Sequence, residues 1–307
     1  MNDPIVIVGA ARTPMGAFQG DFSALTASDL GAVAIKAAVE RAGLKPEQVD
    51  GVLFGNVLQA GQGQAPARQA TIKAGLPVST NAATISKVCG SAMQATMFAF
   101  DALLAGTNEV VVAGGMESMT NAPYLIPKGR SGYRIGHATI FDHMMLDGLE
   151  DAYSKGESGG GRSMGTFGEE CAAKYHFSRA DQDAFAIASV QRAQAATADG
   201  SFKWEIAPVT VTSRAGEVVI DKDEGPQKAK IDKIPSLRAA FKKDGTITAA
   251  SSSSINDGAA ALVLMRESTA KKLGCTPIAR ILGHASHSQE PEWFTTAPVG
   301  AIEKLYK

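Results

Sequence analysis

The chain has 307 residues, which is more than one ordinary domain and enough to bury a sizeable core. Its 30 lysines and arginines nearly cancel 31 aspartates and glutamates, so no net field favours nucleic acid or an anionic membrane as partner. Aromatic residues make up only 6%, which favours helices packed closely on a sheet over a β-sandwich. Composition therefore predicts an α/β protein of two or three structural units.

Three cysteines, Cys89, Cys171 and Cys275, lie far apart in the sequence. An odd number at such spacing is a poor disulfide framework and is typical of a reducing compartment. The N-terminus lacks a basic segment ahead of an apolar run, and no stretch reaches the roughly 18 apolar residues of a membrane helix. The sequence thus predicts a cytoplasmic protein with no membrane partner.

In the first 118 residues, apolar runs of strand length alternate with helical patterns. The predicted strands are 5–8, 49–57, 84–88 and 109–113, and the predicted helices are 28–41, 66–74 and 90–104. Strand–helix–strand units of this spacing predict a mostly parallel sheet with right-handed crossovers.

From residue 116 to about 245 the sequence becomes rich in glycine, proline and charge, which indicates an inserted segment. It holds two amphipathic helices, 167–175 and 181–198. Its glycine-rich stretch 156–161 lacks the Gly-Lys-Ser/Thr ending of a phosphate loop and reads as a linker. The sheet pattern then resumes with a strand at 259–265, a helix to 273 and a strand at 278–282. A helix that starts at 301 lacks a capping glycine, so either the sequence is incomplete or the last turn frays.

Cys89 lies where the predicted strand 84–88 meets the helix opened by Gly90. A thiol at a helix N-terminus faces unpaired backbone N–H groups and the positive end of the helix dipole, both of which favour thiolate. That is the position of a nucleophile. A buried structural cysteine fits this local pattern equally well, so other motifs must decide.

Six motifs occur in order along the chain. They are Ala10-Ala11-Arg12-Thr13-Pro14, the run Gly61 to Gln69, Val88-Cys89-Gly90-Ser91-Ala92, Gly114-Gly115-Met116-Glu117-Ser118-Met119, Met164-Gly165 and Asn256-Asp257-Gly258-Ala259-Ala260. Together they resemble the thiolase family over the whole chain. The resemblance implies an α/β thiolase-like fold, layered α-β-α-β-α, with mixed five-stranded sheets and an inserted loop domain. The N-terminal half would be 1–118 plus 246–274, the loop domain 119–245, and the start of an incomplete C-terminal half 275–307.

By this resemblance Cys89 is the nucleophile that carries the acyl group as a thioester, and its backbone N–H belongs to an oxyanion hole. The implied partners are acetyl-CoA, CoA and 3-ketoacyl-CoA, with coenzyme A as a substrate and no cofactor or metal. Family segments that supply the bases, Gly-His-Pro, Asn-Glu-Ala-Phe and a second Cys followed by Gly, do not occur in residues 1–307. We therefore expect the 307-residue chain alone to be inactive in turnover, and a following second half to restore it.

The resemblance also implies a CoA site. Its residues would be Ser253, which meets the amide part of the pantetheine arm, together with Ala249, Leu149, Met164, Phe294 near the acyl end and Lys228 near the adenine end. The family loop Ala-Gly-Asn-Ala/Ser-Ser-Gly is Ala249 to Ser254 here, so Ala250 and Ser254 stand at glycine positions and Ser251 at an asparagine. If either glycine position needs positive φ, the loop is strained. Ala92 also replaces a glycine of the nucleophile motif.

The leading hypothesis is an acetyl-CoA C-acetyltransferase, and a homodimer or homotetramer is expected because the open strand 84–88 invites pairing. A 3-ketoacyl-CoA thiolase of β-oxidation and a non-catalytic CoA-binding relative are the alternatives. The direction of the reaction, synthesis or thiolysis, stays open. His284 and His287 have no carboxylate or cysteine in ligand register, so they are not expected to bind a metal.

Overall fold

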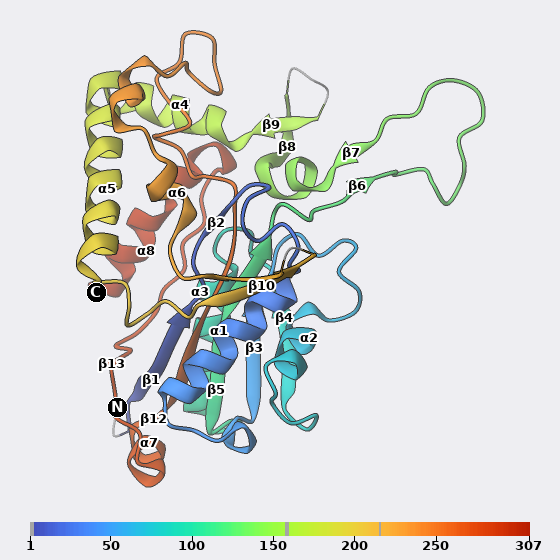
Figure 1. Cartoon of the computed structure of the whole chain (residues 1–307). Coiled ribbons are helices and arrows are strands. Elements are labelled where there is room, and N and C mark those ends of the chain that lie inside the picture. The colour runs from blue at the N-terminus through green and yellow to red at the C-terminus, as the bar shows by residue number, and fades with distance from the viewer. Residues whose placement is uncertain (1–2, 157–159, 215) are drawn as a thin grey trace. The chain divides into compact units, whose positions relative to one another are not determined.

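The computed structural model describes residues 3–156, 160–214 and 216–307. The chain divides into two compact units, each described here by itself (Figure 1). The first unit contains residues 1–121, 196–227 and 255–282, and the second contains 122–195, 228–254 and 283–307.

A mixed sheet forms the centre of the first unit. Its strand order is β13 (Ala279–Arg280), β1 (Ile5–Arg12), β12 (Asn256–Arg266), β5 (Val110–Ser118), β3 (Gly51–Gly55) and β4 (Asn81–Ile85), and β2 (Gly16–Ala17) pairs with β12. The prediction of a mostly parallel sheet is wrong, because only the β3–β4 and β3–β5 pairings are parallel. The late strand β12 runs antiparallel to both β1 and β5. The early strands do share one direction, but the sequence pattern does not reveal that β12 enters between them.

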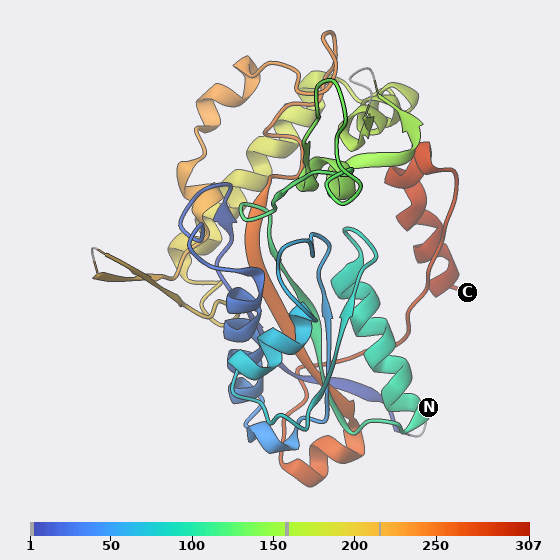
Figure 2. The ribbon, with the colours of Figure 1, turned by 90° about the vertical axis from the view of Figure 1, so that its right-hand side faces the viewer.

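Helices cover both faces of this sheet, α1 (Ala27–Arg41) and α2 (Pro66–Lys73) on one side and α3 (Ser91–Ala105) on the other (Figure 2). Alternate residues of β5 belong to different clusters. Val110 and Val112 pack in the cluster that includes α1, whereas Val111 and Ala113 pack with Leu103 of α3. The centre of the sheet is therefore buried on both faces, as expected for a layered α/β unit.

The segment Val88–Ala105 is long and apolar enough to cross a membrane by length and composition alone. In the structure it contributes Ala99, Phe100 and Leu103 to a core cluster with β5 and β12. Packing on the sheet accounts for the apolar side chains of this face, whereas Met93, Phe98 and Leu104 of the same segment are exposed.

A strap of residues 196–227 joins the first unit through Arg12. The Arg12 guanidinium donates to both carboxylate oxygens of Asp223 at 2.7 and 3.0 Å and to Glu205 at 2.6 Å. Burial by itself lowers the pKa of Arg12, but the hydrogen bonds and charges of Asp223 and Glu205 outweigh it and raise the pKa. The strap contains the hairpin β10 (Val209–Ser213) and β11 (Gly216–Ile220).

The second unit is built from short strands and helices. They are β6 (Tyr124–Leu125), β7 (Phe141–Asp142), a π-helix (Met144–Leu149), β8 (Glu150–Lys155), β9 (Gly161–Ser163), α4 (Met164–Lys174), most of α5 (Arg179–Asp199), 3₁₀ helices at Ile231–Ser236 and Pro291–Thr296, and α8 (Ala297–Leu305). Strands β8 and β9 pair antiparallel around the stretch expected to be a linker, of which residues 157–159 lie outside the described residues.

The expected domain boundaries differ from these units at several places, since residues 119–121 lie in the first unit and residues 246–254 in the second. Residues 196–227 pack with the first unit, because Arg12 and Arg41 bind this strap. Residues 275–282 also stay with the first unit, since β13 pairs with β1 after the helix α7 (Glu267–Leu273). Of the strand expected at 278–282, only Ala279–Arg280 pairs. α6 (Glu224–Lys228) covers the last residues of the strap and Lys228, the first residue of segment 228–254 of the second unit.

Candidate active site

Cys89 lies in a tight turn between β4 and α3, and its side chain is exposed. The strand expected at 84–88 ends earlier, at Ile85. The reason is Val88, whose φ of +46° is left-handed and cannot continue a strand. Gly90 is the N-cap of α3, so Cys89 precedes the helix by two residues. The predicted position of the thiol ahead of a helix is therefore confirmed, with a turn inserted.

Hydrogen bonds close this turn on both sides of Val88. The Gly90 N–H donates to the Lys87 carbonyl at 3.0 Å, and the Ser91 N–H donates to the Val88 carbonyl at 3.1 Å. The Ser91 hydroxyl accepts from the Lys87 N–H at 2.8 Å and donates to the Val88 carbonyl at 2.6 Å. One buried side chain thus bonds to the peptide before Lys87 and to the peptide after the left-handed Val88.

Two glycines let the start of α3 approach the sheet. A Cβ built on Gly55 of β3 would stand 2.6 Å from the Ala92 nitrogen, and one on Gly115 of β5 would stand 2.9 Å from the Ala92 Cβ. Side chains at either position would displace the helix start. Ala92, where the family motif has glycine, fits because Gly115 lacks a side chain.

Three of the motifs found in the sequence meet at the ends of β5 and β12. The Thr13 N–H donates to the Ala259 carbonyl at 2.8 Å, and the Ala259 N–H donates back to the Thr13 hydroxyl at 3.0 Å. The fully buried Asp257 accepts from the Thr120 N–H at 3.0 Å. Asn256 donates its amide to the Gly16 carbonyl at 2.9 Å. The Asn-Asp-Gly motif therefore joins strands of the first unit.

Glu117, in the same loop motif as Gly115, holds the chain that follows β3. Its carboxylate accepts from the backbone N–H groups of Val57 and Leu58, at 2.8 and 3.1 Å, and from the Asn56 amide at 2.7 Å. Sequence reasoning did not assign Glu117 a role. A carboxylate that binds consecutive N–H groups fixes a loop more strongly than neutral hydrogen bonds would.

In the second unit, α4 organises most of the residues expected to bind CoA. Met164 is its first residue, and Leu149 ends the π-helix that precedes β8. The ring of Phe294 lies edge-on to Phe167 of α4, with centroids 6.2 Å apart. Lys228 is the exposed last residue of α6.

The serine-rich loop that carries Ala249 and Ser253 is anchored by Glu169 of α4. The buried carboxylate of Glu169 accepts from the N–H groups of Thr246, at 2.9 Å, and Ile247, at 2.9 Å. Ala249 and Ser253 themselves are exposed. Ala249 and Ser253 thus lie on a loop whose first residues are held by Glu169. This role of Glu169 was not identified from the sequence.

Ala250 and Ser254, which stand where the family loop has glycine, do not show the left-handed strain that a positive φ would cause. Among the described residues, those other than glycine with positive φ are Gln19, Ala65, Val88 and His176. Neither Ala250 nor Ser254 is among them, so their side chains cost no left-handed strain. The Ser251 hydroxyl accepts from the Thr248 N–H at 3.0 Å and holds the turn.

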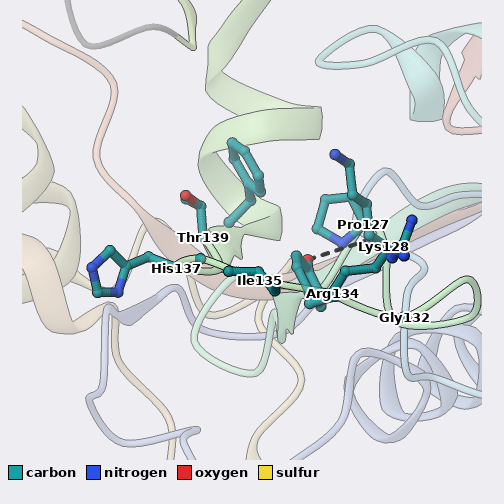
Figure 3. Close-up of a pocket in the computed structure, with 10 residues that line it drawn as sticks. Pro127, Lys128, Gly132, Arg134, Ile135, His137 and Thr139 are labelled. Carbon is teal, nitrogen blue, oxygen red and sulfur yellow. Dashed lines mark hydrogen bonds between the residues drawn. The ribbon is translucent and has the colours of Figure 1, made fainter.

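A concavity of about 570 Å³ lies elsewhere in the second unit, on the long loop between β6 and β7 (Figure 3). Figure 3 shows His137 at one end and Lys128 at the other, and Ile135 is fully exposed. None of the residues expected to bind CoA lines it. The size of a hollow alone therefore does not identify the site.

Comparison with known proteins gives the same family as the motifs. Residues 5–268 match the family described as "Thiolase, N-terminal domain". An acetyl-CoA acetyltransferase of Schizosaccharomyces pombe is 47% identical over 309 residues, covering 100% of this chain and 77% of that protein. Acetyl-CoA acetyltransferase 1 of Arabidopsis thaliana is 49% identical over 306 residues, covering 99% of this chain and 72% of that protein.

The fold agrees as well. The crystal structure of the Acat5 thiolase from Ascaris suum in complex with coenzyme A superposes with a TM-score of 0.90 and 38% sequence identity, covering 98% of this chain and 76% of that one. The thiolase-like fold predicted from the motifs is confirmed. The chain belongs to the thiolase family.

Proposed function

We propose that this protein is an acetyl-CoA C-acetyltransferase in which Cys89 carries the acetyl group. The observation that carries the proposal is the exposed thiol of Cys89, held in a closed turn ahead of α3. The relatives from Schizosaccharomyces pombe and Arabidopsis thaliana are both named as acetyl-CoA acetyltransferases, which supports the same reaction.

The first step is acyl transfer to sulfur. The Cys89 thiolate attacks the thioester carbonyl of acetyl-CoA, a tetrahedral oxyanion forms, and its collapse breaks the bond to the CoA sulfur. CoA leaves as a thiol after taking up a proton equivalent to the one that Cys89 lost when it became a thiolate, and acetyl remains on Cys89. The backbone N–H of Cys89 is the oxyanion donor that this chain supplies.

The second step joins two carbons. A base removes a proton from the α-carbon of a second acetyl-CoA, and the resulting carbanion attacks the acetyl group on Cys89. The thiolate leaves and acetoacetyl-CoA forms; the reverse reaction is CoA-dependent thiolysis. Cys89 takes part in both steps, as the nucleophile in the first and as the leaving thiolate in the second.

Coenzyme A is a substrate in this scheme, and no further cofactor takes part. By the resemblance to thiolases, Ser253 and Ala249 contact the pantetheine arm, and their exposure on the loop that Glu169 anchors supports this assignment. Met164, Leu149 and Phe294 line its apolar part, and Lys228 meets the nucleotide end. The Ascaris suum thiolase with coenzyme A bound supports a CoA site of this kind.

The protein assembles as a homodimer or homotetramer in the cytoplasm. The supporting observation is that β4 ends the order of the sheet, so one side of this strand has no partner strand within the described chain. Open strand edges pair readily with a second copy.

Two alternatives make different predictions. A 3-ketoacyl-CoA thiolase of β-oxidation would acylate Cys89 from long-chain substrates at least as fast as from acetyl-CoA. A non-catalytic CoA-binding relative would bind CoA without acylation. The experiment is to incubate the protein with acetyl-CoA and measure the CoA released, and to incubate it with 3-ketoacyl-CoAs of increasing length and measure the acetyl-CoA released. We expect release from acetyl-CoA that Cys89→Ala abolishes, whereas release that persists in Cys89→Ala would reject the proposal.

A further inference from the structure

We propose that Ser91 is a positioning residue, whose hydroxyl holds the Val88–Cys89 peptide in the orientation that the reaction needs. This inference rests on the proposed function, since it concerns the same thiol. Ser91 is not among the residues assigned a role above. The inference gives its buried side chain a role in the acetylation of Cys89.

The geometry of Ser91 is that of a clamp. Its hydroxyl uses both of its capacities, accepting from the Lys87 N–H at 2.8 Å and donating to the Val88 carbonyl at 2.6 Å. The side chain is buried, with 4% of its surface exposed. Water therefore does not replace the hydroxyl easily.

Val88 needs such a clamp. It is β-branched, and its φ of +46° lies in the left-handed region, where branched side chains are genuine outliers. A conformation of this kind persists only where surrounding contacts enforce it. The Ser91 hydroxyl binds the peptide before Lys87 and the peptide after Val88. It therefore holds the two ends of the Lys87–Val88 segment, whose backbone dihedrals include both of those of Val88.

The second of these peptides belongs also to Cys89. Its carbonyl is that of Val88 and its N–H is that of Cys89, and in a planar trans peptide the two point in opposite directions. Two donors, the Ser91 hydroxyl and the Ser91 N–H, fix the carbonyl at 2.6 and 3.1 Å. They consequently fix the direction of the Cys89 N–H, the proposed oxyanion donor.

Ser91 is itself held firmly. A Cβ built on Gly55 would stand 2.8 Å from the Ser91 Cβ, so the start of α3 lies directly on the backbone of β3. The clamp is thus attached to the centre of the sheet, and orientation of a reacting group by a rigid scaffold is what catalysis requires.

The test compares Ser91→Ala with the double variant Val88→Gly/Ser91→Ala. Glycine adopts the left-handed conformation readily, so it keeps the turn without a clamp. We measure the maximal rate of Cys89 acetylation by acetyl-CoA and the acetyl-CoA concentration that gives half this rate. Ser91→Ala should lower the maximal rate about 10²-fold, the loss typical of one oxyanion donor. The half-saturating concentration should stay within about twofold.

The double variant should recover at least about tenfold of this loss, because its glycine restores the peptide orientation. Ser178→Ala is the matched control. Ser178 of the second unit donates its hydroxyl to Asp181 at 2.6 Å near the start of α5, so Ser178→Ala also removes a hydroxyl hydrogen bond but leaves the turn at Cys89 intact. An acetylation rate of Ser91→Ala equal to that of Ser178→Ala would overturn the proposal, as would failure of Val88→Gly to recover the rate.

A readout without acetyl-CoA separates this proposal from the proposed function. In a crystal structure of Ser91→Ala, the φ of Val88 should leave the left-handed region, and retention of φ near that of the wild type would overturn the positioning role. If the wild type is not acetylated at all while φ changes as expected, the proposed function fails and the clamp stands.

Discussion

Ala92 and Gly115 approach each other so closely that a Cβ on Gly115 would lie 2.9 Å from the Ala92 Cβ. The start of α3, the helix that follows Cys89, therefore packs directly on the backbone of the central strand β5. Gly115→Ala should therefore lower the free energy of unfolding by ~1–3 kcal/mol, as overpacking does, and slow acetylation of Cys89. Chemical denaturation and CoA release measure the two effects.

Adding Ala92→Gly to Gly115→Ala removes the closest contact and should recover part of the stability. Recovery is partial because the Gly55 carbonyl remains 3.2 Å from the new Cβ. Gly225→Ala is the matched control, since nothing lies within 4 Å of a Cβ there. Equal stability of Gly115→Ala and Gly225→Ala would contradict the packing described.

The three cysteines should react in a fixed order. Cys89 is exposed, Cys171 is half-buried and Cys275 is buried. Burial raises the pKa of the Cys275 thiol, so at pH 7 to 8 less of it is thiolate than of an ordinary cysteine. Brief iodoacetamide treatment followed by peptide mass spectrometry should show Cys89 modified first. Labelling of Cys275 at the rate of Cys89 would argue against this order.

Glu169 should matter for substrate binding more than for chemistry. In Glu169→Gln an NH2 group replaces one carboxylate oxygen. This group cannot accept from the N–H of Thr246 or Ile247, so the serine-rich loop loses part of its anchor. We expect the half-saturating acetyl-CoA concentration to rise about tenfold, with a smaller change in maximal rate. Glu170→Gln, which removes an exposed ion pair with Arg162, is the control. Identical saturation curves for the two variants would refute the anchoring role.

Assembly should depend on β4. Ala83 is exposed on this strand, and a lysine on an open edge disfavours pairing with another strand. Ala83→Lys should shift the mass measured by light scattering at micromolar concentration toward the monomer. Ala24→Lys, on an exposed turn, should not. A monomeric wild type would remove the proposed assembly.

The N-terminus of α1 should contribute a pH-dependent stability. Burial raises the pKa of Asp29, but hydrogen bonds from Lys73 and Thr26 and the charge of Lys73 outweigh it, and the pKa lies below the ordinary 3.8. Asp29 is therefore deprotonated more readily in the folded state, and its contribution is present above about pH 4 and lost as pH falls through the folded pKa. Asp29→Asn should cost more stability at pH 7 than at pH 3. A pH-independent difference in urea denaturation would contradict this sign.

Features that depend on residues close in sequence could be predicted, whereas features that depend on residues far apart in sequence could not. The strand and helix that flank Cys89 are local patterns, and so the thiol was placed before α3 correctly. The left-handed backbone of Val88 could not be predicted, because its carbonyl is held by Ser91, and Ser91 in turn packs against Gly55, which is far from it in sequence. Similarly, Glu169 and Thr246 are far apart in sequence, and only the fold brings them together. The direction of β12 escaped prediction for the same reason.

The central claim is that Cys89 carries the acyl group, and one measurement tests it most directly. The protein is incubated with acetyl-CoA, quenched in acid and digested, and the peptide containing Cys89 is examined by mass spectrometry. We predict one acetyl group on Cys89, removed when CoA is added before quenching, and no acetyl on Cys171 or Cys275. An unmodified Cys89 peptide, or acetyl that CoA cannot remove, would contradict the account.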